Sequence, residues 1–154
     1  MTTATDPATF AVVAFVLYVA HDVGDHWIQT DHQAQAKAAP GWAGRLADVR
    51  HVATLTLTQL LAVIGVAAAL GIHLRAEGLA AGLAVNAISH YWADRRTTLA
   101  RLAEIVPGKA QFYRLGAPRP DRDDNPSLGT GAYALDQSWH LAWLIPAALL
   151  ITVI

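Results

Sequence analysis

Hydrophobic residues gather in four long stretches of the chain, and polar residues interrupt three of them. The clearest stretch, 52–74, contains no Asp, Glu, Lys or Arg. A helix that crosses the hydrocarbon core of a bilayer needs about 20 largely apolar residues, so this stretch is long enough to span a membrane. The stretches 9–28, 79–96 and 133–154 are apolar apart from a few polar residues, mainly His and Asp.

This pattern predicts an all-α fold, a polytopic membrane protein whose four-transmembrane-helix bundle forms a single membrane domain over 1–154. The alternative is a soluble bundle, but its helices would show a polar face, and 64–70 (IGVAAAL) shows none. A short amphipathic helix on the membrane surface is expected over 99–106. The expected spans are about 8–28, 51–74, 78–97 and 132–154, with a long loop of about 98–131.

Composition supports the membrane assignment and excludes other classes. Hydrophobic residues make up 54% of the chain and charged residues 15%, against about 25% charged in a soluble domain. The net charge is −1, which excludes a cationic nucleic-acid binder, and the high apolar content excludes intrinsic disorder. The chain has no Cys, so disulfides, thiolate metal sites and a cysteine nucleophile are excluded as well.

The distribution of Lys and Arg predicts the orientation in the membrane. The N-terminal tail has neither residue, and the short turn between the second and third helices has only Arg75. Loops rich in Lys and Arg stay in the cytoplasm, so we expect the other two connections inside and both termini outside the inner or plasma membrane. The first apolar stretch follows no Lys or Arg and is expected to be retained, not cleaved as a signal peptide. The basic residues of those two connections are Lys37, Arg45, Arg50, Arg95, Arg96, Arg101, Lys109, Arg114, Arg119 and Arg122.

The polar residues inside the apolar stretches form three pairs of His and Asp, each four residues apart. Residues at i and i+4 share one helix face. The first and third helices read His-then-Asp, whereas the antiparallel fourth reads Asp-then-His. The three His are therefore expected in one layer about 10 Å beneath the cytoplasmic boundary, and the three Asp in a layer about 4 Å beneath it. The pairs are His21/Asp25, His90/Asp94 and Asp136/His140.

These pairs predict a metal site. Without thiolates, imidazole nitrogen and carboxylate oxygen are the ligands that Zn, Mn or Fe takes in proteins. An ionisable group inside a membrane costs about 2.5–3.5 kcal/mol on insertion and marks a functional site by default. Any single His is better explained as an interfacial or core residue, and Asp94 can pair with Arg95 or Arg96, but three layered pairs favour one or two divalent transition-metal ions. The expected ligands are His21, Asp25, His90, Asp94, Asp136 and His140.

Neighbouring residues are assigned acid–base and supporting roles. His51, at the expected cytoplasmic start of the second helix, and Asp22 are the candidate general bases. Asp22 and His26 form a further i, i+4 pair, turned by about 100° from the first, which either faces a second metal or orients the first ligands. The residues expected to support the ligands are His26, Gln29, Asp48 and Gln137.

An anionic substrate group is expected to meet two kinds of donor. Arg95 and Arg96 carry positive charge next to the third pair, and Gly129 and Gly131 precede or begin the fourth helix, where backbone N–H groups can bind an anion. Two other His residues, His32 in a loop and His73 at the opposite membrane face, are not assigned to the site.

Three motifs carry a resemblance to a known family: HDVGDHWIQTD (21–31), SHYWADRR (89–96) and ALDQSWH (134–140). With these motifs the chain resembles the small bacterial and phage membrane proteins grouped as domain of unknown function 3307. It is also distantly similar to small inner-membrane proteins labelled as predicted metal-dependent hydrolases. That second resemblance implies a metal at the His and Asp residues of the three pairs, and neither resemblance implies a substrate.

Together these observations favour a membrane-embedded, metal-dependent hydrolase. It would act at the cytoplasmic boundary on a lipid-linked or amphipathic phosphate or acyl substrate, with membrane lipids as its partners. Transport of ions, protons or metal is the first alternative, because His and Asp chains line such pathways. The outer stretches 60–70 and 141–154 are almost devoid of polar residues, which disfavours transport. A non-catalytic scaffold, held together by the charged cluster, is the second alternative.

Overall fold

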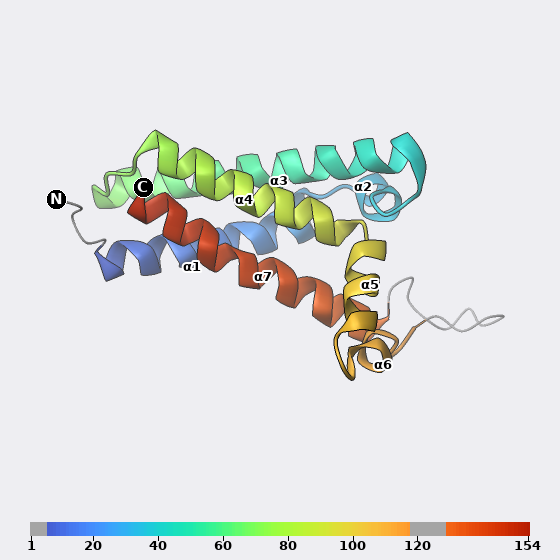
Figure 1. The fold of residues 1–154 in the computed structure, drawn as a ribbon. Helices are drawn as coiled ribbons and strands as arrows, with labels where there is room; N and C mark the ends of the chain where they lie inside the picture. The colour runs from blue at the N-terminus through green and yellow to red at the C-terminus, as the bar shows by residue number, and fades with distance from the viewer. Residues whose placement is uncertain (1–5, 118–128) are drawn as a thin grey trace.

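Four long helices run side by side and form the body of the molecule (Figure 1). The computed structural model describes residues 6–117 and 129–154. Within these ranges the chain is helical and has no strand, which confirms the predicted all-α class. The long helices are α1 (Pro7–Val23), α3 (Gly41–Leu70), α4 (Ala76–Asp94) and α7 (Thr130–Val153).

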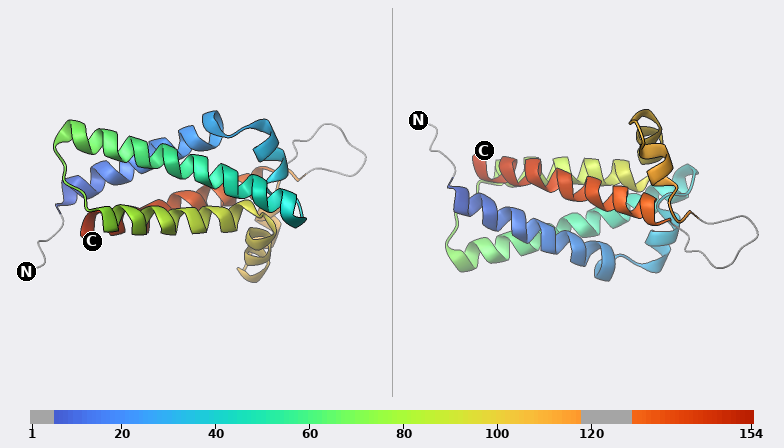
Figure 2. Two further views of the ribbon diagram at one scale, coloured as in Figure 1. Left: turned by 90° about the horizontal axis from the view of Figure 1, so that it is seen from above. Right: turned by 90° about the horizontal axis from the view of Figure 1, so that it is seen from below.

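The short helices gather at one end of the bundle. The connections α1–α3 and α4–α7 lie there, whereas the C-terminus and the short α3–α4 turn lie at the other end (Figures 1 and 2). We call the first of these the α2 end. The two basic connections therefore share one end, as the orientation prediction requires. The short helices are α2 (Asp31–Ala36), α5 (Thr97–Ile105) and α6 (Lys109–Tyr113).

The long helices pack in a square around a buried apolar core. Both α1 and α4 contact α3 and α7. The closest approach is that of α4 to α7, where a Cβ atom on Gly82 would lie 2.5 Å from the Ala147 carbonyl oxygen, so only glycine fits there. The core fills the half of the bundle away from the α2 end and contains Val13, Leu17, Val63, Leu83, Leu144, Ala147, Ala148 and Ile151.

The observed helix ends differ from those predicted by hydropathy. The second long helix begins at Gly41 instead of near 51, because a helix can continue into the aqueous boundary where the apolar stretch has already ended. It ends at Leu70, since Gly71 adopts a left-handed conformation with φ 68°. The first helix changes at Gly24–Ile28 into a π-helix, η1, a form that is frequent at functional sites.

The predicted long loop contains α5 and α6. The first of these is the expected amphipathic helix, with Leu99 and Ala103 buried. Part of the loop, including Arg119 and Arg122, lies outside the described residues.

Two helical stretches of the described chain are long and apolar enough to cross a membrane: Pro7–Ile28, which comprises α1 and η1, and α3. The other two long helices, α4 and α7, contain 19 and 24 residues and do not meet the same criterion of hydropathy and charge.

Candidate metal centre

Three His side chains from three helices converge between the apolar core and the α2 end. His21 of α1, His90 of α4 and His140 of α7 are each at most 1% exposed. The ring centroids of His90 and His140 are 3.9 Å apart, and that of His21 is 5.2 Å from each. The convergence follows from the antiparallel order of the helices, which brings the three His to the same depth in the bundle.

Each His is in contact with the Asp four residues away on its own helix. Imidazole Nε2 and a carboxylate oxygen are 3.7 Å apart in the first pair, 3.2 Å in the second and 3.5 Å in the third. The Asp residues lie one helical turn nearer the α2 end than their His partners, so a layer of carboxylates covers the layer of imidazoles. These pairs are His21/Asp25, His90/Asp94 and His140/Asp136.

His51 brings the fourth long helix into the cluster. Its Nε2 atom is 3.0 Å from Nε2 of His90, 3.0 Å from Oδ1 of Asp25 and 3.4 Å from Oδ2 of Asp94. It is completely buried because α3 extends beyond it to Gly41. The predicted general base therefore lies among the predicted ligands, not at a helix start.

The cluster offers three overlapping sets of metal ligands. In each set one ligand atom from every residue lies within 4.8 Å of the others. Since His90 and His140 each belong to two sets, the sets form one continuous site with room for more than one arrangement of ions. The sets are His21/His90/His140, Asp25/His51/His90 and Asp94/Asp136/His140.

Buried polar atoms test whether these residues fit a metal. Nε2 of His21, Oδ1 of Asp25, Oδ2 of Asp94 and Nε2 of His140 have no hydrogen-bond partner within the described part of the chain. A buried polar atom without a partner costs about 1–3 kcal/mol, so several together call for a shared partner. Imidazole and carboxylate donors at this spacing fit a divalent transition metal such as Zn, Mn or Fe.

Lys37 joins the cluster, a role that the sequence analysis missed. Its ammonium nitrogen is 2.9 Å from Oδ1 of Asp94, and the residue is 8% exposed. The guanidinium of Arg95 donates to the carbonyl oxygens of Lys37 and Ala39 and lies 3.8 Å from Oδ2 of Asp48. Arg95 and the buried Asp48 thus hold the backbone that carries Lys37. In the sequence, the Thr30–Gln33 capping box indicates the start of α2, but it does not indicate that Lys37 reaches the cluster.

A cavity of about 170 Å³ at the α2 end opens onto the carboxylates of the cluster. Four residues assigned to substrate binding or ligand support lie on its wall. At its rim, Nε2 of His26 is 3.3 Å from the hydroxyl oxygen of Tyr133. The lining consists of Asp25, His26, Gln29, Ala34, Lys37, Asp94, Arg96, Tyr133, Asp136 and Gln137.

Other assigned residues do not point into the site. The Asp22 side chain is 65% exposed and lies 3.3 Å from Nδ1 of His26, away from the cluster, because it is turned around the helix from Asp25. His32 and His73 are exposed and lie outside the cluster, as expected, but His32 lies in α2 and not in a loop.

The glycines at the start of α7 serve close packing. The Gly131 N–H donates to the Leu115 carbonyl oxygen at 3.0 Å, and a Cβ atom there would lie 1.7 Å from the Phe112 carbonyl oxygen. This corrects the expectation that the Gly131 amide is free to bind an anion. Gly129 caps α7 and lies against Leu115 and Ala117 in the same way. Arg95 is likewise engaged with backbone carbonyls, which leaves Arg96 as the assigned cation that faces the cavity.

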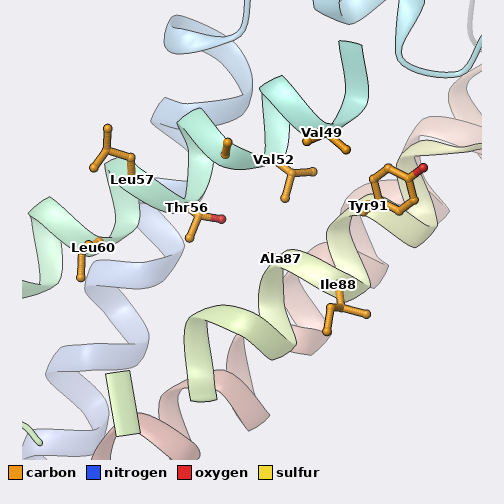
Figure 3. A pocket seen from close by; sticks show the side chains of 9 residues that line it. Val49, Val52, Thr56, Leu57, Leu60, Ala87, Ile88 and Tyr91 are labelled. Carbon is orange, nitrogen blue, oxygen red and sulfur yellow. The ribbon is translucent and has the colours of Figure 1, made fainter. Parts of the chain in front are cut away.

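A second hollow, of about 620 Å³, lies between α3 and α4 on the outside of the bundle (Figure 3). Aliphatic side chains such as Leu57, Leu60 and Ile88 line it, and Tyr91 supplies a hydroxyl group near one end (Figure 3). Its described lining contains no His, Asp or Glu, so the candidate metal ligands lie at the smaller cavity instead.

The molecule is therefore a helical bundle with a buried His/Asp cluster that could bind a metal. The chain belongs to the family described as Protein of unknown function (DUF3307), whose sequence profile matches residues 13–154. This confirms the resemblance carried by the three motifs; the distant likeness to predicted hydrolases is not supported by a match. No curated protein and no solved structure matches the chain.

Proposed function

We propose that the protein spans a membrane four times, with the α2 end in the cytoplasm. Only 28% of the apolar window in Pro7–Ile28 and 22% of that in α3 is buried inside the protein. Large apolar side chains face outward, such as Leu61 at 62% and Ile88 at 71% exposure. A soluble protein seldom leaves so much apolar surface in water, whereas lipid covers it at no cost.

The lengths of α4 and α7 support the same arrangement. At a rise of about 1.5 Å per residue they are about 28 and 36 Å long, which matches a hydrocarbon core of about 30 Å. Both pack against each other along their length and complete the square with the two more apolar helices. Their polar residues turn inward, since His90 and His140 are buried in the cluster.

We infer that this protein is a metal-dependent hydrolase. The observation that carries the proposal is the convergence of buried imidazole and carboxylate atoms beside a cavity, several of which accept or donate no hydrogen bond within the described residues. A divalent ion at these ligands would supply a water of lowered pKa and a Lewis acid for a phosphoryl or acyl oxygen. The residues that would hold it are His21, Asp25, His90, Asp94, Asp136 and His140.

His51 is the candidate general base of the reaction. A base needs a nitrogen within reach of the attacking water and a group that stabilises its protonated form. Nε2 of His51 is 3.0 Å from the Asp25 carboxylate, which would stabilise the imidazolium. In an alternative arrangement His51 would instead help to hold a second metal together with Asp25 and His90.

The position of the cavity points to an amphipathic substrate. It lies at the α2 end, one helical turn beyond the imidazole layer, where the headgroup of a lipid-linked molecule would meet the carboxylate layer. Gln29 and Gln137 on its wall offer hydrogen bonds to such a headgroup, and Arg96 offers a positive charge.

Transport is the second candidate, and one observation favours it. A polar pair, Asn86 and Gln59, continues from the cluster into the bundle, with the Asn86 amide nitrogen 2.8 Å from Oε1 of Gln59. Beyond this pair the interior is aliphatic, with Leu17, Val63 and Leu83 buried. The polar column therefore ends inside the protein, which favours a reaction at the α2 end over passage across the membrane.

Hydrolysis by the purified protein tests the proposal. In detergent we expect it to cleave a chromogenic phosphate ester or acyl ester that carries an alkyl chain, with loss of activity on chelation and recovery on addition of Zn, Mn or Fe. The variant His140→Ala is expected to be inactive, whereas His73→Ala, at the opposite end, is the matched control. Equal turnover by wild type and His140→Ala would contradict the proposal.

A further inference from the structure

The connection between η1 and α3 brings a lysine into the cluster. The Thr30 hydroxyl accepts the Gln33 backbone N–H, and the Gln33 side chain accepts the Thr30 N–H, so α2 is capped at its first turn. At the other end of α2, Arg95 holds the carbonyl oxygens of Lys37 and Ala39. The backbone on both sides of Lys37 is therefore fixed, and its ammonium group reaches the cavity at a defined position.

Asp94 joins Lys37 to the ligand set. Oδ2 of Asp94 faces the imidazoles, 3.2 Å from Nε2 of His90 and 3.4 Å from Nε2 of His51. Its other oxygen, Oδ1, lies 2.9 Å from the Lys37 ammonium on the cavity side. A metal on the first oxygen and the ammonium on the second would be neighbours, close enough for one tetrahedral anion to contact both.

Arg96 adds a second cation to the same cavity. It lines the wall with Lys37 and is the only non-glycine residue with positive φ, 52°, in the described ranges. Such a conformation is unfavourable for a residue with a side chain and persists where the surrounding structure requires it. Because of this backbone conformation, the side chains of Arg95 and Arg96 point in different directions. Arg95 supports the backbone of Lys37, and Arg96 faces the cavity.

The charges around the cavity indicate the substrate class. Three carboxylates and two side-chain cations line the cavity, so one divalent ion makes its wall net positive, and the cations on the wall then face an anion. A phosphoryl group with several charged oxygens can bind two cations beside the metal, whereas a neutral ester group cannot. The carboxylates are Asp25, Asp94 and Asp136, and the cations are Lys37 and Arg96.

We propose that Lys37 and Arg96 form a phosphate-binding wall next to the metal centre, so that the substrate is a phosphate ester or anhydride and not an acyl compound. This inference rests on the proposed function. Lys37 and Arg96 contact the phosphoryl oxygens, and Arg95 acts as a positioning residue through the backbone of Lys37. Anion binding follows metal binding, because the metal-free region carries more negative than positive charge.

Binding of inorganic phosphate and of dodecyl phosphate to detergent-solubilised protein tests the proposal, with dodecyl acetate as the neutral comparison. Calorimetry should show that the metal-loaded wild type binds one or both phosphates and not the acetate. Lys37→Met and Arg96→Met should each weaken phosphate binding by at least about tenfold, with metal content unchanged. Arg101→Met, on the exposed face of α5, is the matched control and should bind as wild type.

Other results would contradict either the phosphate-binding wall or the metal centre itself. Metal-loaded protein that binds no phosphate, or Lys37→Met and Arg96→Met variants that bind it as wild type, would overturn the phosphate-binding wall and leave the metal centre standing. Wild type that holds no metal would overturn the proposed function, and the inference with it. If Lys37→Met fails to fold, the proposal is tested with Arg96→Met and with the charge-conserving Lys37→Arg. Arg96→Met should weaken phosphate binding, and Lys37→Arg should retain it.

Discussion

Asp94 is the residue that joins the candidate metal ligands to the proposed phosphate-binding wall. It contacts His90 and His51 with one carboxylate oxygen and the Lys37 ammonium with the other. Its side chain is 1% exposed, whereas that of Asp136 is 17% exposed. Removal of its charge therefore affects both the metal ligands and a buried lysine, and the other two Asp residues affect the ligands alone.

Replacement of each Asp by Asn distinguishes a metal site from a structural ion cluster. We expect Asp25→Asn and Asp136→Asn to lose metal and keep the melting temperature of the metal-free protein, because ligand removal relieves unfavourable charge in an active site. Asp94→Asn should be less stable by about 3–5 kcal/mol, since it leaves the Lys37 ammonium buried without its partner. Thermal unfolding and metal content are measured on the same samples.

The double variant Asp94→Asn/Lys37→Met is the control for this interpretation. It removes both charges and should recover most of the lost stability. An Asp94→Asn variant as stable as Asp136→Asn would contradict the buried Lys37–Asp94 pair. Large losses at Asp25 and Asp136, in protein that never held metal, would instead indicate a purely structural cluster.

At the scale of single residues, the helical periodicity predicted the three His/Asp pairs. It did not predict how the connections between the long helices run. His21 and Asp25 share a face in any α-helix, so their proximity needs only the i, i+4 spacing. Lys37 lies in a short segment without periodic pattern, and its position depends on contacts with Arg95 and Asp94. Such contacts join parts of the chain that are distant in sequence, and the sequence carried no sign of them.

At the scale of elements, hydropathy located all four long helices but not their ends. The apolar stretch of the second helix begins near residue 51, whereas α3 itself starts at Gly41. This extension surrounds His51 with protein and brings Asp48 beside Arg95. The π-helix η1 was not predicted either, and at its start Gly24 packs closely on α3, where a Cβ atom on Gly24 would lie 2.7 Å from Leu55.

The whole molecule has its polar chemistry at one end and its aliphatic core at the other. The basic connections lie at the α2 end (Figure 1), the cluster and the cavity lie toward it, and the aliphatic core lies away from it. The proposed four-span topology would place this polar end at the cytoplasmic membrane boundary, where a lipid-linked substrate would present its headgroup.

Reporter fusions test this topology. A reporter that is active only outside the cytoplasm, fused after Ile154, should be active, because both basic connections are expected to stay inside. The same reporter inserted after Gly108, between α5 and α6, should be inactive and serves as the paired control. If the reporter is active after Gly108 and inactive after Ile154, the orientation is the opposite of the proposed one and the site lies at the outer face.

The metal content of the purified protein tests the central claim most directly. Wild-type protein should bind one or two divalent ions of Zn, Mn or Fe per chain after reconstitution and dialysis, and His90→Ala and His140→Ala should lose most of this metal. His32→Ala and His73→Ala change exposed residues outside the cluster and should retain it. Wild-type protein that takes up no divalent metal, or equal metal loss in all four variants, would contradict the assignment of the buried His/Asp cluster as a metal centre.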